Sequence, residues 1–405
     1  MKIIHTADWH IGKKLHNYDL QEDFECFIQW LLTIIEAEKV EVLLISGDIF
    51  DLANPSSSSR SQYYESLVAL KKAVNKIILT GGNHDSPAML NAPRELLKAL
   101  DLNVVGGLPQ DYREVLFPLK NRQGVIEVVV AALPFLRNSD LQYPSVIKTY
   151  EERLEALREG IEKVFKQTEE LCRTLYPGIP ALAMGHLYAA GSETSDSERD
   201  IQIGNQAAVR ADSFGNYFQY VALGHIHKPQ RVSGNIPIFY SGSPIALSFS
   251  EREDKKRILL MDTAKGWEPE SIAVPSFRKL IKVAGDLGSI STKLTNLSKN
   301  EGLPNLIEIE LKEKVYQAKQ LHGLEVLVDN FVKPGYQIVK HRATFENQRK
   351  QTGEIYKETV SLEELKPERV FDELLQQEDF SSTEEQEIRM AFHELMEELE
   401  NKRGA

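Results

Sequence analysis

Cysteine is scarce in this chain. The 405 residues include two cysteines, Cys26 and Cys172, which lie far apart in helix-like stretches. This usage argues against a disulfide framework and against a cysteine-based zinc site. No apolar run approaches the roughly 18 to 20 residues that a membrane span needs, and no basic leader with an apolar segment follows Met1. We therefore expect a cytoplasmic protein that does not use a membrane.

Positive charge is not in excess either, because the formal net charge is −12. A polyanionic ligand such as nucleic acid would need cations supplied locally, by metal ions, by a partner or by small basic clusters. Lys13 with Lys14 and Lys228 with Arg231 are candidates for such clusters. The sequence also lacks the phosphate-binding loop G-x-x-x-x-G-K-[ST], so ATP would have to be handled by another chain.

What the sequence does contain is a series of apolar strands that end in polar residues. The run at 42–46 ends at Gly47 and delivers Asp48 onto a loop, and helical patterns flank it. Continuous apolar character of this kind is typical of a strand buried on both faces of a sheet in an α/β fold. Other predicted strands end in the same way, and the candidate metal ligands at these ends are Asp8, His10, Asp48, Asn83, His186, His225 and His227, with His84 beside them.

These residues offer oxygen and nitrogen donors without a thiolate, which suits Mn²⁺ or Fe²⁺ better than structural Zn²⁺. Two such ions about 3.5 to 4 Å apart can clamp a phosphate for in-line displacement. The ligand shared by both ions must be a carboxylate, and we predict that it is Asp48. A single histidine or one Gly-Asp pair would indicate little. Together, in this order and after successive strands, the residues predict a dinuclear metal site.

Four regions follow one another along the chain. Residues 1–270 form the α/β region with the candidate ligands, and 277–344 alternate strand and helix patterns as a small α/β module. Residues 345–361 are polar and predict a linker. Residues 362–405 predict two amphipathic helices.

The apolar faces of these terminal helices carry two sets of side chains. They can pack on each other or on the small module, or they can bind a partner, since an exposed apolar face on a tethered helix is a common docking element. The first face has Val370, Phe371, Leu374 and Leu375; the second has Ile388, Ala391, Phe392, Leu395, Met396 and Leu399.

The strand-end residues carry a family resemblance. Asp8-x-His10, Gly47-Asp48-x-x-Asp51, Gly82-Asn83-His84-Asp85, Gly185-His186 and Gly224-His225-x-His227 resemble the five motifs of the calcineurin-like metallophosphoesterase superfamily. The flanking segments HTADWHIGKKL, LISGDIFDLANP, GNHDSPAML, GHIHKPQ and YSGSPIALSFSE are similar to the family of bacterial SbcD nuclease subunits, counterparts of the archaeal and eukaryotic double-strand-break repair nuclease. The resemblance is dense over residues 1–260 and looser beyond.

This resemblance implies a four-layer metallophosphoesterase β-sandwich flanked by helices, a small α/β capping domain and a C-terminal helical pair. It implies that one Mn²⁺ is held by Asp8, His10, Asp48 and His227, and the other by Asp48, Asn83, His186 and His225. It further implies a nuclease dimer that acts on DNA as a double-strand exonuclease and a single-strand or hairpin endonuclease in repair and recombination. An SbcC-type, SMC-like ATPase would bind the C-terminal helices.

His84 would contact the scissile phosphate in this family without binding metal, and its imidazolium could stabilise the leaving oxygen or donate a proton to it. The alternative is that His84 orients Asp48. Protein Ser/Thr phosphatases are excluded, because Leu52-Ala53 and Asp85 replace their Arg-Gly and Glu. A small-molecule phosphodiesterase on the same site and a scaffold without catalysis remain alternatives, although no ligand position is lost.

Overall fold

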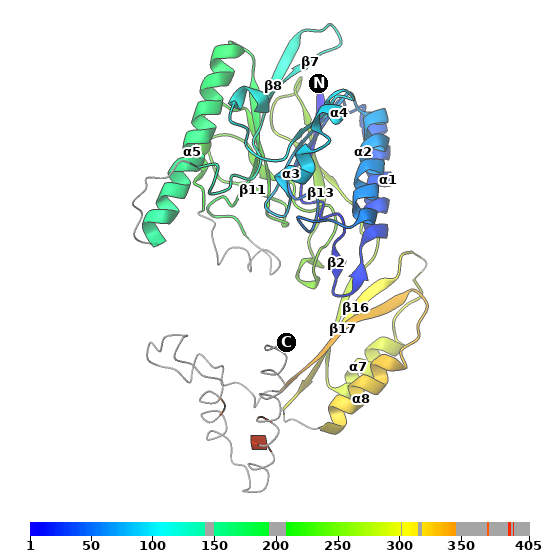
Figure 1. The fold of residues 1–405 in the computed structure, drawn as a ribbon. Helices are drawn as coiled ribbons and strands as arrows, with labels where there is room; N and C mark the ends of the chain where they lie inside the picture. The colour runs from blue at the N-terminus through cyan, green and yellow to red at the C-terminus, as the bar shows by residue number, and fades with distance from the viewer. Residues whose placement is uncertain are drawn as a thin grey trace. The chain divides into compact units, whose positions relative to one another are not determined.

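The computed structural model describes residues 1–141, 150–193, 208–300, 302–314 and 318–345, together with Phe371, Ile388, Arg389 and Phe392. The chain divides into two units, Met1–Thr344 and Phe345–Ala405. The α/β class expected from the sequence is confirmed in the first unit (Figure 1).

The first of two six-stranded sheets carries the N-terminal strands. Its order is β14 (Glu270–Ala273), β13 (Arg257–Asp262), β1 (Lys2–Thr6), β4 (Val42–Ser46), β5 (Lys76–Thr80) and β6 (Leu102–Val105). The last four strands in this order are parallel, and β13 and β14 are antiparallel additions at one edge. The first sheet thus continues past residue 270, the expected end of the first domain.

The second sheet has parallel strands in its centre and antiparallel strands at its edges. Its order is β11 (Gln230–Val232), β12 (Ile238–Tyr240), β10 (Tyr220–Gly224), β9 (Ala181–His186), β8 (Ile126–Ala132) and β7 (Leu116–Lys120). β8, β9, β10 and β12 run parallel to one another. Both sheets therefore gather several strand ends at one edge, which is where the candidate ligands lie.

The core lies between the sheets and under the helices that cover them. One face of β4, with Val42 and Leu44, packs in the same cluster as Val130 and Leu182 of the second sheet. The other face packs against α1 (Gln21–Glu38) and α2 (Ser57–Ala73), while α5 (Tyr150–Leu175) packs against the second sheet. Figure 1 shows α5 and the α1–α2 pair on opposite sides of the sheets. Burial on both faces explains the uninterrupted apolar sequence of β4.

Short elements complete the region around the sheets. They are β2 (Lys14–Leu15), β3 (Tyr18–Asp19), α3 (Pro87–Asn91), α4 (Arg94–Lys98) and the 3₁₀ turns Tyr112–Val115, Ala211–Phe214 and Phe249–Glu251. Within the described ranges, no helix combines the length and the apolar character that crossing a bilayer requires.

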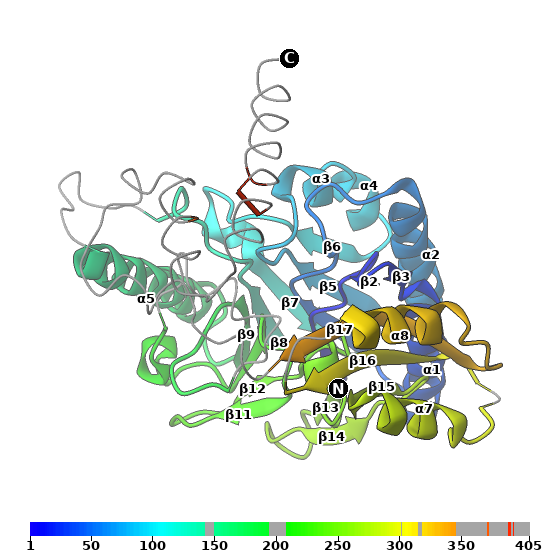
Figure 2. The ribbon, with the colours of Figure 1, turned by 90° about the horizontal axis from the view of Figure 1, so that it is seen from below.

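A smaller three-stranded sheet follows, with its own apolar cluster. It consists of β15 (Leu280–Gly285), α7 (Leu287–Thr295), β16 (Asn305–Glu313), α8 (Ala318–Asp329) and β17 (Tyr336–Phe345), and β16 is the central strand (Figure 2). A buried ion pair ties this module to α1, because Arg278 Nε donates to Asp23 Oδ1 at 2.7 Å.

The expected linker and terminal helices lie almost entirely outside the described residues. Phe371 and Phe392, one from each expected apolar face, stack with ring centroids 3.9 Å apart and an interplanar angle of 5°. At this point the two faces contact each other, which was one of the alternatives left open by the sequence.

Candidate metal centre

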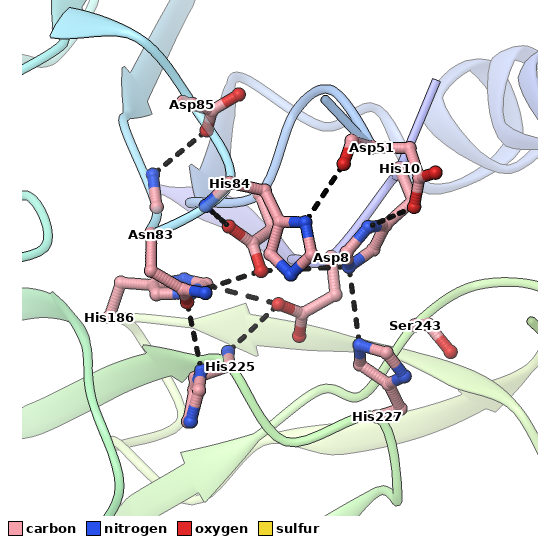
Figure 3. A network of polar contacts seen from close by, with 12 residues as sticks. Asp8, His10, Asp51, Asn83, His84, Asp85, His186, His225, His227 and Ser243 are labelled. Carbon is pink, nitrogen blue, oxygen red and sulfur yellow. Dashed lines mark hydrogen bonds and ion pairs between the residues drawn. The ribbon is translucent and has the colours of Figure 1, made fainter. Parts of the chain in front are cut away.

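The candidate ligands come together at the carboxyl ends of five strands (Figure 3). The loops after β1 and β4 stay side by side beyond the sheet, since Asp8 N donates to Gly47 O at 3.1 Å and His10 N donates to Asp48 O at 3.0 Å. The second sheet joins them directly, because His225 N donates to Asp8 Oδ1 at 2.8 Å. The site therefore bridges the two sheets.

Four of the candidate ligands have left-handed backbone conformations. Their φ angles are 54° at Asp8, 46° at His10, 48° at Asp48 and 102° at His225. Residues other than glycine seldom adopt positive φ, and such strained positions concentrate at functional sites. The surrounding hydrogen bonds hold these conformations in place of a more relaxed backbone.

Glycines next to the ligands allow the loops to approach closely. A Cβ atom at Gly82 would lie 2.1 Å from Asp48 Oδ1, and one at Gly224 would lie 1.8 Å from Ser46 O. Any side chain at either position would push the two loops apart. The glycines in the sequence motifs thus have a packing role that the ligands depend on.

Asp48 occupies the centre of the cluster and is 1% exposed. Its Oδ2 lies 3.5 Å from His10 Nε2 and 3.3 Å from His186 Nε2, which are on different sides of the carboxylate. Its Oδ1 accepts a hydrogen bond from His84 N at 2.9 Å. This position is the one that a carboxylate shared by two ions would take.

Three of the histidines present Nε2 to the centre because their Nδ1 atoms have partners behind them. An acceptor at Nδ1 keeps the proton there and leaves the lone pair of Nε2 for a metal. The pairs are His10 Nδ1 with Asp51 Oδ1 at 3.2 Å, His186 Nδ1 with Ser46 O at 3.0 Å and His227 Nδ1 with Glu251 Oε1 at 3.2 Å.

The cluster has two halves on either side of Asp48. In one, the Nε2 atoms of His10 and His227 face each other at 3.2 Å. In the other, Asn83 Oδ1 lies 3.0 Å from both His186 Nε2 and His225 Nδ1. All seven residues predicted as ligands are thus gathered around one carboxylate.

Charge in the cluster is poorly balanced by the protein itself. Burial raises the pKa of Asp8 to about 7, and burial lowers the pKa of His225 to about 3. Burial would also lower the pKa of His186, but the carboxylates of Asp48 and Asp8 outweigh it and raise that pKa to about 9. A proton on His186 therefore compensates charge that a divalent cation would neutralise more fully.

The residues present fit a pair of divalent ions. Among the described residues, Asp8 Oδ2 and His225 Nε2 are buried without a hydrogen-bond partner. Two groups have ligand atoms close enough to share an ion, namely His10, Asp48 and His84, and Asp48, His186 and His225. Both groups contain Asp48, so the geometry matches two adjacent sites with a common carboxylate.

His84 lies at the edge of the cluster with its ring partly exposed. Its Nδ1 donates to Asp51 O at 2.8 Å, and its ring centroid is 4.9 Å from that of His10. The hydrogen bond to Asp48 comes from the backbone N of His84, so the orientation of Asp48 does not depend on the imidazole.

Several partners of the ligands carried no signal of their own in the sequence. Glu251 and Lys256 lie behind His227, and Arg137 Nη2 donates to Asp85 O at 2.7 Å beside the Asn83 loop. Asp85 accepts from the backbone N of Ile49, Phe50 and Gly82, which joins the loops after β4 and β5. The expected second role for Asp85, as a loop-fixing carboxylate, is what these bonds provide.

The surface cations expected along a nucleic-acid backbone are mostly paired. Lys228 contacts Glu193, Arg231 Nη1 lies 2.9 Å from Glu268 Oε1, and Lys13 Nζ lies 3.0 Å from Asp51 Oδ1. Paired surface charges contribute little attraction for a polyanion.

Comparisons with known proteins agree with this geometry. Residues 1–229 match the calcineurin-like phosphoesterase family model, and 276–379 match the model described as the type 5 capsule protein repressor C-terminal domain. The chain is 38% identical to the SbcD subunit of nuclease SbcCD from Rhodobacter capsulatus, over 68% of its length and 69% of the relative. It is 29% identical to the Escherichia coli K12 protein of the same name, over 97% of both chains, and 30% identical to the Bacillus subtilis one, over 90% and 91%.

Proposed function

Because the chain belongs to the calcineurin-like phosphoesterase family, and within it to the SbcD nucleases, we propose that it hydrolyses DNA phosphodiester bonds with two Mn²⁺ ions. The proposed activities are exonuclease cleavage of double strands and endonuclease cleavage of single strands and hairpins, in end processing, repair and recombination. The observation that carries the metal-dependent chemistry is the convergence of all seven candidate ligands on the buried carboxylate of Asp48.

The proposed ligand sets follow the two halves of the cluster. Asp8, His10, Asp48 and His227 would hold one ion, and the facing Nε2 atoms of the two histidines support this set. The other ion would be held by Asp48 together with Asn83, His186 and His225, whose contacts with one another lie on the far side of the carboxylate. Oxygen and imidazole donors without thiolate favour Mn²⁺.

In this proposal, the bound ions supply Lewis acidity and orient the phosphate for in-line attack. The protein keeps the ligands dry and fixed, since Asp8, Asp48 and His186 are at most 1% exposed. His84 is the partly exposed group next to them, and its Nδ1–H is committed to Asp51 O. Its Nε2 is therefore the atom that would deliver a proton to the leaving oxygen or stabilise the charge on it.

The layering and the assembly are also part of the proposal. We take the two sheets with α1 and α2 on one side and α5 on the other as the four-layer sandwich of the family, and 277–344 as a capping domain. Tyr64 and Val68 on α2 and Leu96 on α4 expose apolar side chains, which supports a homodimer through these helices.

The ATPase partner follows from the names of the relatives, each of which is the SbcD component of an SbcCD nuclease. We propose that an SbcC-type, SMC-like ATPase binds this chain through residues 362–405. The stacked rings of Phe371 and Phe392 support a helical pair that presents one combined face, in place of two independent helices.

A direct test uses full-length protein stripped with a chelator and reloaded with Mn²⁺, Mg²⁺ or Zn²⁺. Bound metal and cleavage of linear duplex, hairpin and single-stranded DNA are measured together, with a chromogenic phosphodiester as comparison. Two bound Mn²⁺ ions with cleavage of DNA are expected. Hydrolysis of the chromogenic ester without DNA cleavage would favour the small-molecule phosphodiesterase, and no hydrolysis of either would favour a scaffold.

A further inference from the structure

A buried acid and base lie directly behind one of the candidate metal ligands. Glu251 ends the 3₁₀ turn Phe249–Glu251, and Lys256 precedes β13; their side chains are 0% and 7% exposed. Glu251 Oε1 lies 3.2 Å from His227 Nδ1, on the side of the ring that faces away from the cluster. A buried carboxylate without a positive partner would be costly, and Lys256 supplies one at 2.7 Å.

Lys256 is bound at several points. Its Nζ donates to Glu251 Oε2, to Ser243 Oγ at 2.9 Å and to the backbone O of His227 at 3.1 Å. One lysine thus fixes both the carboxylate behind the imidazole and the main chain that carries it. Rotation of the His227 ring would break the contact with Glu251, and movement of its backbone would break the contact with Lys256.

His10 has a similar arrangement on the opposite side of the same half of the cluster. Its Nδ1 contacts Asp51, and Lys13 Nζ contacts the same carboxylate oxygen at 3.0 Å. His186 in the other half has a backbone carbonyl, Ser46 O, behind its Nδ1. Two lysine–carboxylate–histidine series therefore converge on one half, where the two Nε2 atoms meet at 3.2 Å.

From these contacts we propose that Glu251 and Lys256 are positioning residues that keep His227 Nε2 directed at the ion it shares with His10. The inference rests on the metal centre proposed above and adds two residues that act through His227 without touching substrate. A carboxylate behind a metal-bound histidine fixes the ring orientation and raises its strength as a ligand, and losing it commonly weakens metal binding by about 10- to 100-fold.

The same residues have structural contacts that a test must separate from this role. Glu251 Oε2 also accepts from Leu247 N at 3.1 Å, and Ser248 Oγ donates to Oε1 at 3.2 Å, so the loop that holds the turn depends on it. A merely structural role would lower thermal stability and weaken both ions together. A positioning role would weaken one ion selectively.

The experiment titrates Mn²⁺ into chelator-stripped, full-length protein and follows free Mn²⁺ by electron paramagnetic resonance. The variants are Glu251→Gln and the double variant Glu251→Gln with Lys256→Met, which removes both buried charges and avoids leaving one unpaired. Glu253→Gln is the matched control, because this residue lies in the same segment with its side chain 84% exposed.

Wild-type protein and the Glu253→Gln control are expected to bind two ions. Glu251→Gln should weaken one of them by about 10- to 100-fold and leave the other within about threefold. The double variant should regain thermal stability relative to the single variant while the metal defect persists. Wild-type affinity for both ions in the double variant would overturn the inference, as would equal weakening of both ions that the double variant repairs. Fewer than two ions in wild-type protein would instead refute the proposed metal centre.

Discussion

Replacing His84 separates its imidazole from its backbone, because the two make different contacts. In His84→Ala, the backbone N still donates to Asp48 Oδ1, and the side chain loses the hydrogen bond from Nδ1 to Asp51 O at 2.8 Å. The geometry of Asp48 is therefore expected to survive the substitution. The alternative in which His84 serves to orient Asp48 is satisfied by the amide, which alanine also has.

The cost to folding is small compared with the cost to catalysis. One partly buried hydrogen bond contributes about 0.5 to 1.5 kcal/mol, well below the roughly 5 to 15 kcal/mol that stabilises a typical domain. Loss of a general acid slows a reaction by about 10²- to 10⁴-fold, which corresponds to about 3 to 5 kcal/mol in the activation free energy. The variant should thus be folded, loaded with metal and slow.

The assay is single-turnover cleavage of a labelled DNA hairpin at saturating Mn²⁺, with bound metal measured on the same samples. His322→Ala is the control, since its side chain is 78% exposed and lies in α8 of the small module. The reasoning is refuted if His84→Ala binds less Mn²⁺ than wild type. That result would assign His84 to the ligand group in which its ring nitrogen lies near those of His10 and the oxygens of Asp48.

The same geometry predicts three further outcomes. Asp48→Ala should remove both ions and abolish cleavage, because both halves of the cluster depend on this carboxylate; two bound metals with full activity would contradict the shared-ligand assignment. Gly224→Ala should lower thermal stability and metal content together, since its Cβ would lie 1.8 Å from Ser46 O; unchanged values in calorimetry and metal analysis would count against the required close approach. Truncation after residue 345 keeps the whole of β17 and should leave a folded Mn²⁺-dependent nuclease that no longer co-purifies with its ATPase; unchanged affinity would exclude the tail as the docking element.

The parts of the site that the sequence predicted share a local signal. A strand buried on both faces has to be apolar throughout, as in β4, so a polar residue at its end stands out. Asp48 and His225 follow such strands directly, and adjacent glycines mark where the loops come close. The parallel order of the strands then brings their ends to one edge, which turns separate motifs into one cluster.

The parts that the sequence did not predict depend on contacts between distant segments. Glu251 lies 24 residues from His227, and its role depends on a turn that folds back behind the ring. Arg278 and Asp23 are 255 residues apart, and nothing in either segment indicates the other as its partner. Asp85 looked like a motif residue, but its three backbone donors could be identified only from the folded loops.

The charge of the chain gives the metal centre a second role in the proposed function. A formal charge of −12 opposes binding of DNA, and Lys228 and Arg231 are paired with surface glutamates. Two divalent ions at the strand ends would place four positive charges where the phosphate has to bind, next to the partly exposed His84. Since the buried carboxylates there are otherwise compensated by protons and hydrogen bonds, metal loading would convert a site that repels phosphate into one that attracts it. Substrate binding and catalysis would then depend on the same ions, and an unloaded chain would be silent in both.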